Sequence, residues 1–288
     1  MSLPNLPDPA RRGARWRMRG LRYATVTALA VGLTSSVPAA PARATTTFVV
    51  LQMNLCNSGM ARSCYSFGKA VDEAVAKIHR YRPQLVTLQE ICLDDLYGVH
   101  GWGKLAQAMA DLYGSRHIRV DFTPAVNRLS GDWYRGCVNG EQYGVAMIQH
   151  DTGPDNGRDI HRGWYANQGR GIEQRAWTCT TIIKDRLTGC TTHLTINRDV
   201  AMRQCRELMS IVAASWMTPE VIIAGDFNLT VEPGKPHDVQ NCAPSGYDRV
   251  SDDALQQVFF TRSVQLVQSR HEPMKWTDHP LLYEQFRI

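Results

Sequence analysis

The sequence lacks the short motifs that mark several common enzyme and metal-binding classes. Residues 45–288 contain no G-x-x-x-x-G-K-[ST] phosphate loop, no G-x-S-x-G nucleophile elbow and no H-E-x-x-H zinc motif. They also contain no C-x-x-C pair, internal repeat or low-complexity tract. These absences argue against P-loop nucleotide hydrolysis, serine-hydrolase chemistry and a cysteine-bound zinc.

The N-terminal segment has the composition of a secretory signal peptide. An arginine-rich stretch over residues 1–22 precedes the apolar run 23–34, and the segment ends in Ala-Arg-Ala44. The apolar run is too short to span a bilayer, and its position before an A-x-A site predicts cleavage after Ala44. A twin-arginine pair near the start leaves both the Sec and the twin-arginine export routes open. We therefore expect a secreted, extracellular protein whose mature chain is residues 45–288.

Without that segment the chain lacks a strong net charge. The formal net charge of +5 belongs to all 288 residues, which include 32 Lys and Arg against 27 Asp and Glu. Residues 1–44 hold seven of the basic and one of the acidic residues, which leaves 25 basic against 26 acidic. No global basic field therefore remains to attract nucleic acid. Any attraction for phosphate must be local or carried by a metal ion.

Cysteine is present in an even number, and all eight cysteines lie in residues 45–288. In an exported chain this predicts disulfide bonds, although spacing alone does not determine their connectivity. Our hypothesis is that Cys56–Cys64 closes a short local loop and that Cys179–Cys190 bridges a predicted β-hairpin. The two further pairs, Cys92–Cys137 and Cys205–Cys242, follow by elimination.

Apolar periodicity predicts alternating strands and helices in one domain, residues 45–288. Helical spacing predicts helices over 66–81, 103–113 and 199–216. Apolar runs predict strands at 47–55, 84–91, 117–123, 142–150, 175–184, 189–197, 221–230, 255–262, 263–269 and 280–287. A Gly- and Asp-rich tract, 151–171, predicts a surface loop near the functional site. This order of elements favours a mixed α/β arrangement of two or four layers.

Polar residues recur where the apolar strands end. They are Asn54, Glu90, His193, Asp226, Asn228, Asp278 and His279. Each alone has an ordinary explanation as a turn residue, a cap or a satisfied strand histidine. A whole set of such residues is harder to explain one at a time, because strand ends along one edge of a sheet cluster in space.

The side chains in this set suit metal-assisted phosphoester hydrolysis. Glu90, Asn54 and an aspartate offer hard oxygen ligands, too few to enclose a calcium ion. Such a set suits Mg²⁺ or Mn²⁺, which retain waters and take substrate phosphate oxygens. The two histidines titrate near neutral pH and are suited to act as base and acid. Asp226 and Asn228 lie on one side of an extended chain, where they can hold a water against phosphorus.

Five short motifs resemble the ordered motifs of the endonuclease/exonuclease/phosphatase family: QMN (52–54), LQE (88–90), TTHL (191–194), GDFN (225–228) and TDH (277–279). The likeness covers essentially all of residues 45–288. It implies the deoxyribonuclease I-like fold, a four-layer α/β sandwich with two central mixed, mainly antiparallel sheets flanked by helices. It also implies a catalytic Mg²⁺ or Mn²⁺ at the sheet edges, with a structural Ca²⁺ as a further candidate.

The resemblance also implies a role for each residue of the set. Glu90 would be the principal metal ligand, with Asn54 as a neighbouring metal or phosphate contact and Asp278 beside them at the metal site. Asp226 would orient the nucleophilic water, and Asn228 the phosphate.

The two histidines have separate roles in this resemblance. His279 would be the base-like histidine, and His193 would bind the phosphate or protonate the leaving oxygen. The segment Gly140–Gly144 is similar to the deoxyribonuclease segment whose glutamate orients that second histidine. Glu141 is therefore expected to pair with His193.

One position departs from the family pattern. Family members carry an aspartate at the start of the strand read here as 255–262, where it supports the base-like histidine. Gln256 or Gln257 occupies that place, and a glutamine cannot stabilise an imidazolium as a carboxylate does. Other acids nearby are alternative partners of the histidine, and the choice stays open: Asp248, Asp252 and Asp253.

Substrate preference is open within this family. The export segment, the GEQYG segment and the loop residues Arg170 and Arg175 favour a nuclease that cleaves DNA or RNA, with Arg175 contacting phosphate. The alternative is a secreted phosphodiesterase or phosphatase for lipid headgroups, either sphingomyelinase-like or acting on inositol phosphate. A third hypothesis is a catalytically decayed binding protein on the same scaffold. We expect a monomer with no stable protein partner.

Overall fold

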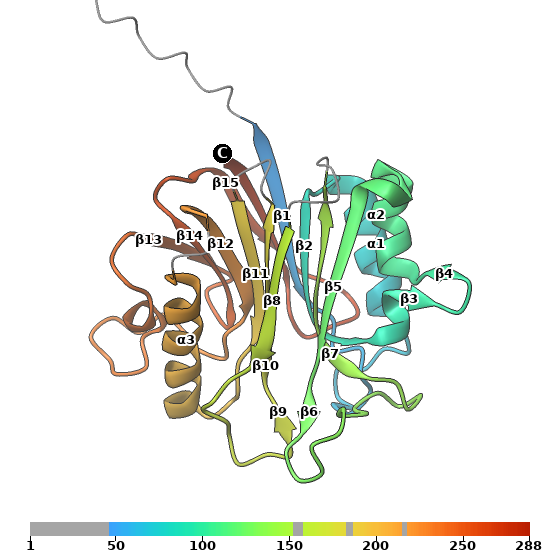
Figure 1. Ribbon diagram of the computed structural model, residues 1–288, viewed down its shortest axis with the longest axis horizontal. Helices are drawn as coiled ribbons and strands as arrows, with labels where there is room; N and C mark the ends of the chain where they lie inside the picture. The colour runs from blue at the N-terminus through green and yellow to red at the C-terminus, as the bar shows by residue number, and fades with distance from the viewer. Residues whose placement is uncertain (1–45, 152–157, 183–186, 215–217) are drawn as a thin grey trace, which may run out of the picture. The chain divides into compact units, whose positions relative to one another are not determined.

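The computed structural model describes residues 46–151, 158–182, 187–214 and 218–288, and Figure 1 shows their arrangement. The expected signal peptide, residues 1–44, lies outside this described part. Residues 44–288 form one compact unit, and its two large sheets have six strands each.

The first sheet has the strand order β15–β16–β1–β2–β7–β5, and the second has the order β13–β14–β12–β11–β10–β8. The strands of the first sheet are β1 (Thr47–Asn54), β2 (Leu85–Cys92), β5 (Ile118–Pro124), β7 (Tyr143–His150), β15 (Gln265–Glu272) and β16 (Leu281–Arg287). Those of the second are β8 (Arg158–Trp164), β10 (Ala176–Ile182), β11 (Leu187–His193), β12 (Glu220–Asp226), β13 (Tyr247–Ser251) and β14 (Gln256–Thr261). Two short ribbons complete the strands: β3 (Tyr97–Gly98) with β4 (Gly101–Trp102), and β6 (Val126–Asn127) with β9 (Glu173–Gln174).

The sheets pack face to face, and helices cover their outer faces (Figure 1). Alternation along β1 shows how the sequence produces this arrangement: Phe48 and Val50 face the second sheet, whereas Val49 and Leu51 face the helices. Helices α1 (Lys69–Tyr81) and α2 (Lys104–Tyr113) pack on the first sheet, and α3 (Arg198–Val212) packs on the second. The expected four-layer α/β sandwich is confirmed.

The three helices follow the predicted ranges, with small differences at their ends. Helix α1 begins after Gly68, whose φ of 83° is left-handed, and α3 begins where the Asn197 side chain accepts a hydrogen bond from the Val200 N–H group. The last residues of the range predicted for α3 lie partly outside the described part of the chain. Among the described residues, no helix is long and apolar enough to span a bilayer.

The surface loop predicted over residues 151–171 is wrong for residues 158–164, which form strand β8. This strand pairs antiparallel with β10 along its whole length, from Trp164 opposite Ala176 to Arg158 opposite Ile182. Its mixed polar sequence is typical of an edge strand with one solvated face, and it therefore lacks the apolar run that the prediction required.

Each sheet contains one parallel strand pair connected through a helix. In the first sheet β1 and β2 are parallel, with Asn54 opposite Gln89. In the second, β11 and β12 are parallel, with His193 opposite Asp226. The carboxyl ends of a parallel pair lie at the same sheet edge. The two pairs thus bring four of the predicted polar positions to one end of the sandwich.

A β-bulge in β2 adjusts the position of Glu90. The predicted strand ends at residue 91 and β2 continues to Cys92, so Glu90 lies inside the strand. The pairing register with β7 shifts between Leu88 and Ile91, and Glu90 has a left-handed φ of 55°. Because a bulge turns one side chain out of the strict strand alternation, Glu90 points to the end of the sandwich without terminating the strand.

The structure pairs all eight cysteines, as Cys56–Cys64, Cys92–Cys137, Cys179–Cys190 and Cys205–Cys242. The hypothesis for their connectivity is confirmed. Two of the bridges hold loops at the end of the sandwich where the polar residues meet, and these are Cys56–Cys64 and Cys92–Cys137. Bridges of this kind typically stabilise a fold by about 2–4 kcal/mol each.

A buried acid on β16 predicts a stability that falls with rising pH. Glu284 is 0% exposed between the sheets, and burial raises its pKa to about 8 against the opposing effect of a contact with Ser269. No Lys, Arg or His of the described residues lies within ion-pair distance of this carboxyl group. Folding therefore opposes ionisation, and the cost grows from pH 4.5, the ordinary pKa, to about pH 8.

We expect the Glu284→Gln variant to melt at a higher temperature than the unmodified protein at pH 8, with little difference at pH 5. The variant removes the ionisation cost but keeps the size of the side chain. Thermal melts of both proteins between pH 5 and pH 9 test this, and a difference in melting temperature that does not change with pH would contradict it.

Candidate active site

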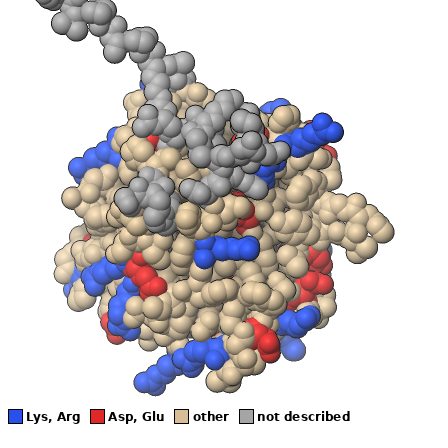
Figure 2. Space-filling model, in the orientation of Figure 1, with Lys and Arg blue, Asp and Glu red and all other residues tan. Residues whose placement is uncertain are grey.

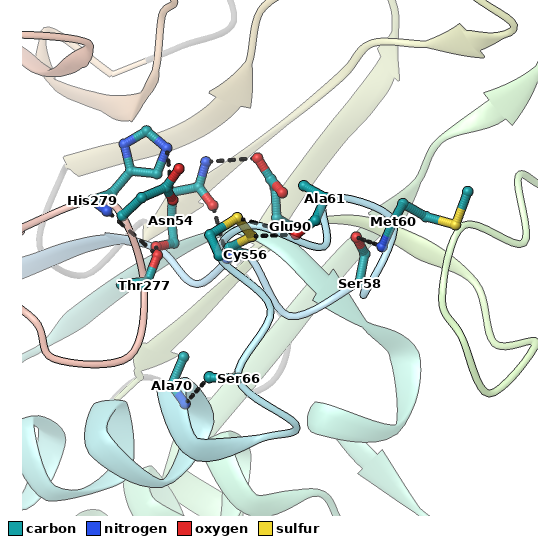
Figure 3. The surroundings of a disulfide bond; sticks show 12 residues. Asn54, Cys56, Ser58, Met60, Ala61, Ser66, Ala70, Glu90, Thr277 and His279 are labelled. Carbon is teal, nitrogen blue, oxygen red and sulfur yellow. Dashed lines mark hydrogen bonds and ion pairs between the residues drawn. A yellow bond between two sulfur atoms is a disulfide. The ribbon is translucent and has the colours of Figure 1, made fainter.

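Three polar side chains from three strands meet at the end of the sandwich. Asn54 Nδ2 lies 3.0 Å from Glu90 Oε1 and 2.9 Å from Asp226 Oδ2, so one amide group donates to both carboxylates. The orientation of this amide is determined locally, because Asn54 Oδ1 accepts a hydrogen bond from the Cys56 N–H group at 3.1 Å. Figure 3 shows the Asn54 amide directed at Glu90 beside the Cys56–Cys64 disulfide.

The loop after β1 holds both the backbone and the side chains of this site. The Asn57 N–H group donates to the Glu90 carbonyl oxygen at 2.8 Å, and Thr277 Oγ1 donates to the Asn54 carbonyl oxygen at 2.9 Å (Figure 3 shows Thr277). Cys56 itself has a left-handed φ of 45°. The disulfide to Cys64 therefore closes a loop whose backbone conformation orients Asn54 and Glu90.

The electrostatics of Glu90 favour a cation beside it. Burial raises the pKa of Glu90, and the nearby Asp226 carboxylate raises it further, against the opposing hydrogen bond from Asn54. Two carboxylates that share one amide donor in a partly dry pocket repel each other when both are ionised. A bound divalent cation relieves that repulsion, and their hard oxygen atoms are the ligands that Mg²⁺ prefers.

Asn54 and Asp278, the other two predicted metal ligands, differ in what their side chains can offer. Asn54 uses its Nδ2 and one side of Oδ1 inside the protein, which leaves only the second lone pair of Oδ1 for a metal ion. The Asp278 side chain is 57% exposed, and its Oδ1 lies 3.6 Å from His279 Nε2. Asp278 is therefore open to solvent and to substrate at the mouth of the site.

His193 is buried and faces both carboxylates. Its Nε2 lies 3.9 Å from Glu90 Oε1 and 4.0 Å from Asp226 Oδ2. Burial lowers the pKa of His193 well below its ordinary value, and the positive charges of Arg175 and His279 lower it further. His193 is therefore neutral at neutral pH and serves as a hydrogen-bonding group.

Arg175 places a guanidinium group next to the carboxylates. Burial alone would lower its pKa, but Glu173, Tyr143 and Glu90 outweigh burial, so the pKa of Arg175 is raised and its charge is retained. Its Nη1 is buried and has no hydrogen-bond partner among the described residues. Gln168 holds the backbone of Arg175, because Gln168 Oε1 accepts from its N–H group at 2.8 Å. A buried unpaired donor of this kind suits an anionic substrate group.

The residue beside His279 is Gln256, and the alternative acids are elsewhere. Gln256 Nε2 lies 3.3 Å from His279 Nδ1. The other candidates have their own contacts: Asp248 with Arg262, Asp252 with the backbone of Ala254 and Gln256, and Asp253 in a turn with a left-handed φ of 63°. The position that departs from the family pattern thus contacts the histidine directly.

A chain of buried amides sets the direction of this contact. Gln52 Oε1 accepts from Thr87 Oγ1 at 2.6 Å and from Gln89 Nε2 at 3.1 Å, so Gln52 Nε2 faces Gln256 and donates to its Oε1 at 2.6 Å. The Nε2 of Gln256 then faces His279 Nδ1. A donor at this position leaves Nδ1 as the acceptor and the ring proton on Nε2.

The carboxylates on the other side of the ring agree with this tautomer. His279 Nε2 lies 3.6 Å from Asp226 Oδ2, so its N–H group faces an acceptor. An aspartate in place of Gln256 would instead accept from Nδ1 and leave Nε2 free to act as a base. The substitution therefore changes which ring nitrogen is able to donate toward substrate.

Asn228 joins the ends of the two parallel strands of the second sheet. Its Nδ2 donates to the Leu194 carbonyl oxygen at 2.8 Å, and its N–H group donates to Asp226 Oδ1 at 3.0 Å. It adopts a left-handed φ of 49°, which non-glycine residues rarely do outside functional or turn positions. Asp226 therefore has both carboxylate oxygens held by neighbours.

The expected pair between Glu141 and His193 is absent from the described part of the chain, and no hydrogen bond or ion pair joins them. Glu141 lies in the turn between Cys137 and β7, where its N–H group donates to Asn139 Oδ1 at 3.1 Å. The carboxylates that face His193 are Glu90 and Asp226. The resemblance of a short segment did not determine where its loop would fold.

Several residues at the site were missed from the sequence. Gln52 and Gln89 are 0% exposed polar residues inside apolar strands, and this interruption of the pattern is a signal that could have identified them. Glu173 pairs with Arg175, with 3.5 Å between Glu173 Oε1 and Arg175 Nε. Nothing in the local sequence distinguishes Glu173 from a surface acid.

The completed arrangement can bind and hydrolyse a phosphate ester. It offers a carboxylate pair for a cation, a guanidinium group and a neutral imidazole for phosphoryl oxygens, and a second imidazole beside an aspartate. These are the parts that metal-assisted displacement at phosphorus uses.

Comparisons with known proteins agree with this chemistry. The model of a family described as the endonuclease/exonuclease/phosphatase family matches residues 64–279. A comparison with curated proteins found no significant match. Among solved structures, an endonuclease/exonuclease/phosphatase from Beutenbergia cavernae superposes with a TM-score of 0.60 at 17% identity, covering 84% of this chain and 72% of that chain.

Two further solved structures are aligned with this chain over nearly their whole length. The 2′,3′-cyclic phosphatase ANGEL2, in complex with adenosine-2′,3′-vanadate, gives a TM-score of 0.58 at 13% identity over 85% of this chain and 96% of its own. A member from Bacteroides vulgatus gives 0.57 at 12% identity over 84% and 98%. At these identities the structural likeness shows the fold alone.

Proposed function

The chain belongs to the endonuclease/exonuclease/phosphatase family and is a phosphoester hydrolase, and we propose that it is a secreted Mg²⁺-dependent nuclease that cleaves phosphodiester bonds of DNA. The observation that carries the proposal is the joint approach of Glu90 and Asp226 to one amide, with Arg175 and His193 beside them. RNA is the second nucleic acid that this chemistry would accept, because cleavage by water does not need a 2′-hydroxyl group.

Enzymes of this family generally use divalent metal ions, and the donor set of this chain fits one. Glu90 and Asp278 would hold the ion, with the free lone pair of Asn54 Oδ1 as a further ligand. A bound Mg²⁺ supplies neutralisation of phosphate charge. The raised pKa of Glu90, caused by burial and by Asp226, supports a cation beside Glu90, because these two carboxylates repel each other when both are ionised without one.

The protein groups then orient the substrate and the attacking water. Arg175 binds a phosphoryl oxygen with its unpaired Nη1 donor. His193 hydrogen bonds to another phosphoryl oxygen as a neutral imidazole, because its lowered pKa keeps it uncharged at neutral pH. Asn228 orients the phosphate beside them.

Asp226 receives the proton of the attacking water. The water oxygen bonds to phosphorus as the ester P–O bond breaks on the opposite side, and the leaving oxygen takes a proton from solvent. The Nε2 of His279 lies 3.6 Å from Asp226 Oδ2, beyond hydrogen-bond distance, and an N–H group there favours the orientation of the carboxylate that faces the water.

A lipid headgroup is the second candidate substrate, and one observation favours it. Large apolar side chains are exposed on loops at the end of the sandwich that carries the site, including Phe67 at 83%, Leu129 at 78% and Met60 at 61%. Exposed apolar residues near a phosphodiesterase site suit a membrane surface. Complete assembly of the polar site counts against the third hypothesis, a decayed binding protein.

A comparison of substrates tests the proposal. Supercoiled plasmid and sphingomyelin vesicles are incubated with the protein in Mg²⁺, in EDTA, and in EDTA followed by excess Mg²⁺. We expect plasmid relaxation with Mg²⁺, its loss in EDTA and its return with added metal. Release of phosphocholine with the plasmid left intact would replace the proposal by the lipid alternative, and inactivity on both would favour the binding protein.

A further inference from the structure

Three adjoining cavities lead away from Glu90 across the β6–β9 ribbon. The first, about 290 Å³, is lined by Glu90, Arg175 and Tyr134. Tyr134 also lines the second, about 660 Å³, together with Trp133. Trp133 in turn lines the third, about 390 Å³, together with Trp164. Each cavity thus shares one lining residue with the next, and we call the three together the β6–β9 groove.

The backbone of residues 126–134 explains this connection. Val126 pairs with Gln174 in the ribbon and forms a bridge with Trp133, and the Tyr134 N–H group donates to the Ala125 carbonyl oxygen at 2.8 Å. Successive residues of an extended segment point to opposite sides. Tyr134 therefore faces the site, where it packs edge-on to Tyr143, and Trp133 faces the outer cavity.

The outer cavity presents aromatic faces. Trp133 and Trp164 are 47% and 40% exposed, with ring centroids 6.0 Å apart. Trp164 Nε1 donates to the Pro124 carbonyl oxygen at 2.9 Å, so the polar edge of that ring is satisfied by protein and its position is held. Two indoles that remain this exposed leave apolar faces for a flat partner.

Arginines accompany the aromatic residues along the groove. Arg135 lines the second cavity and Arg162 the third, and Arg128 joins the ribbon to the next loop. Each donates to backbone carbonyl oxygens: Arg135 to Gly140 at 3.1 Å, Arg162 to Phe122 at 3.2 Å, and Arg128 to Gly169 and Arg170, both at 3.1 Å. In the described part of the chain, no carboxylate lies within ion-pair distance of these three side chains.

The second and third cavities therefore each contain an arginine that is not paired with a described carboxylate. Figure 2 shows Lys and Arg side chains along the edge of this face where Figure 1 places β6 and β9. Glu90 and Glu173 line the first cavity, Asp132 lines the second and Asp121 the third. Asp121 is buried and accepts from Thr180 Oγ1 at 2.6 Å, whereas Asp132 is on the surface. Unpaired arginines beside exposed rings complement a chain of phosphates that carries flat bases.

We propose that the β6–β9 groove binds a single strand of nucleic acid whose bases stack on Trp133 and Trp164 and whose phosphates contact the arginines. This inference rests on the proposed nuclease function and names its substrate form. Bases inside a duplex are stacked on each other and do not expose their faces, whereas unpaired bases do. A membrane-inserting edge would project from the surface, but these indoles line a cavity.

The test measures binding of a fluorescein-labelled oligothymidylate in EDTA, where hydrolysis does not interfere. We expect the Trp133→Ala, Trp164→Ala double variant to bind on the order of 10-fold or more weakly. Arg135→Gln should weaken binding and lower the slope of log affinity against log salt by about one unit. The matched control is Phe67→Ala, which removes another exposed ring that does not line the groove.

The outcomes separate this inference from the proposed function. Weakened oligothymidylate binding in the double variant and in Arg135→Gln, with unchanged binding in Phe67→Ala, supports the groove. Unchanged oligothymidylate binding in both variants overturns it while plasmid cleavage stands. Loss of binding to phosphatidylglycerol vesicles instead would assign the surface to membranes. If the unmodified protein cleaves no nucleic acid, the proposed nuclease function fails, and the inference that rests on it fails with it.

Discussion

The Glu90→Gln variant is expected to hydrolyse phosphodiesters on the order of 10²-fold or more slowly, because charge neutralisation by a bound metal is worth several kcal/mol. Glutamine keeps an oxygen for Asn54 Nδ2, which lies 3.0 Å from Glu90 Oε1, so the fold should remain intact. The variant also removes a buried carboxylate whose pKa is raised by burial and by Asp226. Its melting temperature in EDTA should therefore equal or exceed that of the unmodified protein.

Two measurements check this prediction. Initial rates of plasmid relaxation give the loss of activity, and thermal melts with and without Mg²⁺ show whether the metal still stabilises the variant. The Glu141→Gln variant serves as the comparison, because Glu141 makes no contact with His193 in the described residues and activity should stay close to that of the unmodified chain. A normal rate for Glu90→Gln, or a large loss for Glu141→Gln, would reverse the assignment of the two acids.

The His279→Ala variant is expected to lose about 10²-fold or more in rate, the scale for removing one preorganised hydrogen-bond donor at the reacting centre. The imidazole lies 3.6 Å from Asp226 Oδ2 through Nε2 and 3.3 Å from Gln256 Nε2 through Nδ1. If its contribution is the Nε2–H donor, glutamine at this position should recover part of the activity, because its amide nitrogen reaches the same place. A side chain that acted as a base could not be replaced in this way.

Rates for His279→Ala, His279→Gln and His279→Asn distinguish the two roles. We expect the order Gln above Asn and Ala, since asparagine is one bond shorter and places its amide near the Nδ1 position. Nitrogen chemical shifts of the His279 ring report the tautomer directly, with a proton expected on Nε2. Equal loss in all three variants, together with a proton on Nδ1, would restore the base role that the family resemblance implies.

Much of the fold was predictable because its causes are local. The apolar periodicity of residues 69–81 and the alternation along β1 depend on neighbours within a few positions, and both elements form where predicted. The residue types that end the strands were visible in the same way. Strand β8 was not predicted, because an edge strand with mixed polar residues has no apolar run and is held by its hydrogen bonds to β10.

The partner of His279 shows where local sequence stops being informative. Gln256 and three nearby aspartates were all compatible with the pattern, and the choice depends on the packing of two sheets. Gln52 and Gln256 are 204 residues apart in the chain, yet their side chains are hydrogen bonded at 2.6 Å. No periodicity in either strand encodes which amide of one sheet will meet which amide of the other.

The sequence by itself determined the chemistry available at the site: carboxylates, amides and imidazoles at the ends of apolar strands, and eight cysteines that pair. The tertiary structure alone decided how these groups face one another. It placed Glu90 in a bulge and Glu141 in a turn with no described contact to His193, and it placed the Gln256 amide within hydrogen-bond distance of His279. The physical reason is that residue type and period act along the chain, whereas hydrogen-bond direction and charge proximity depend on contacts between elements far apart in sequence.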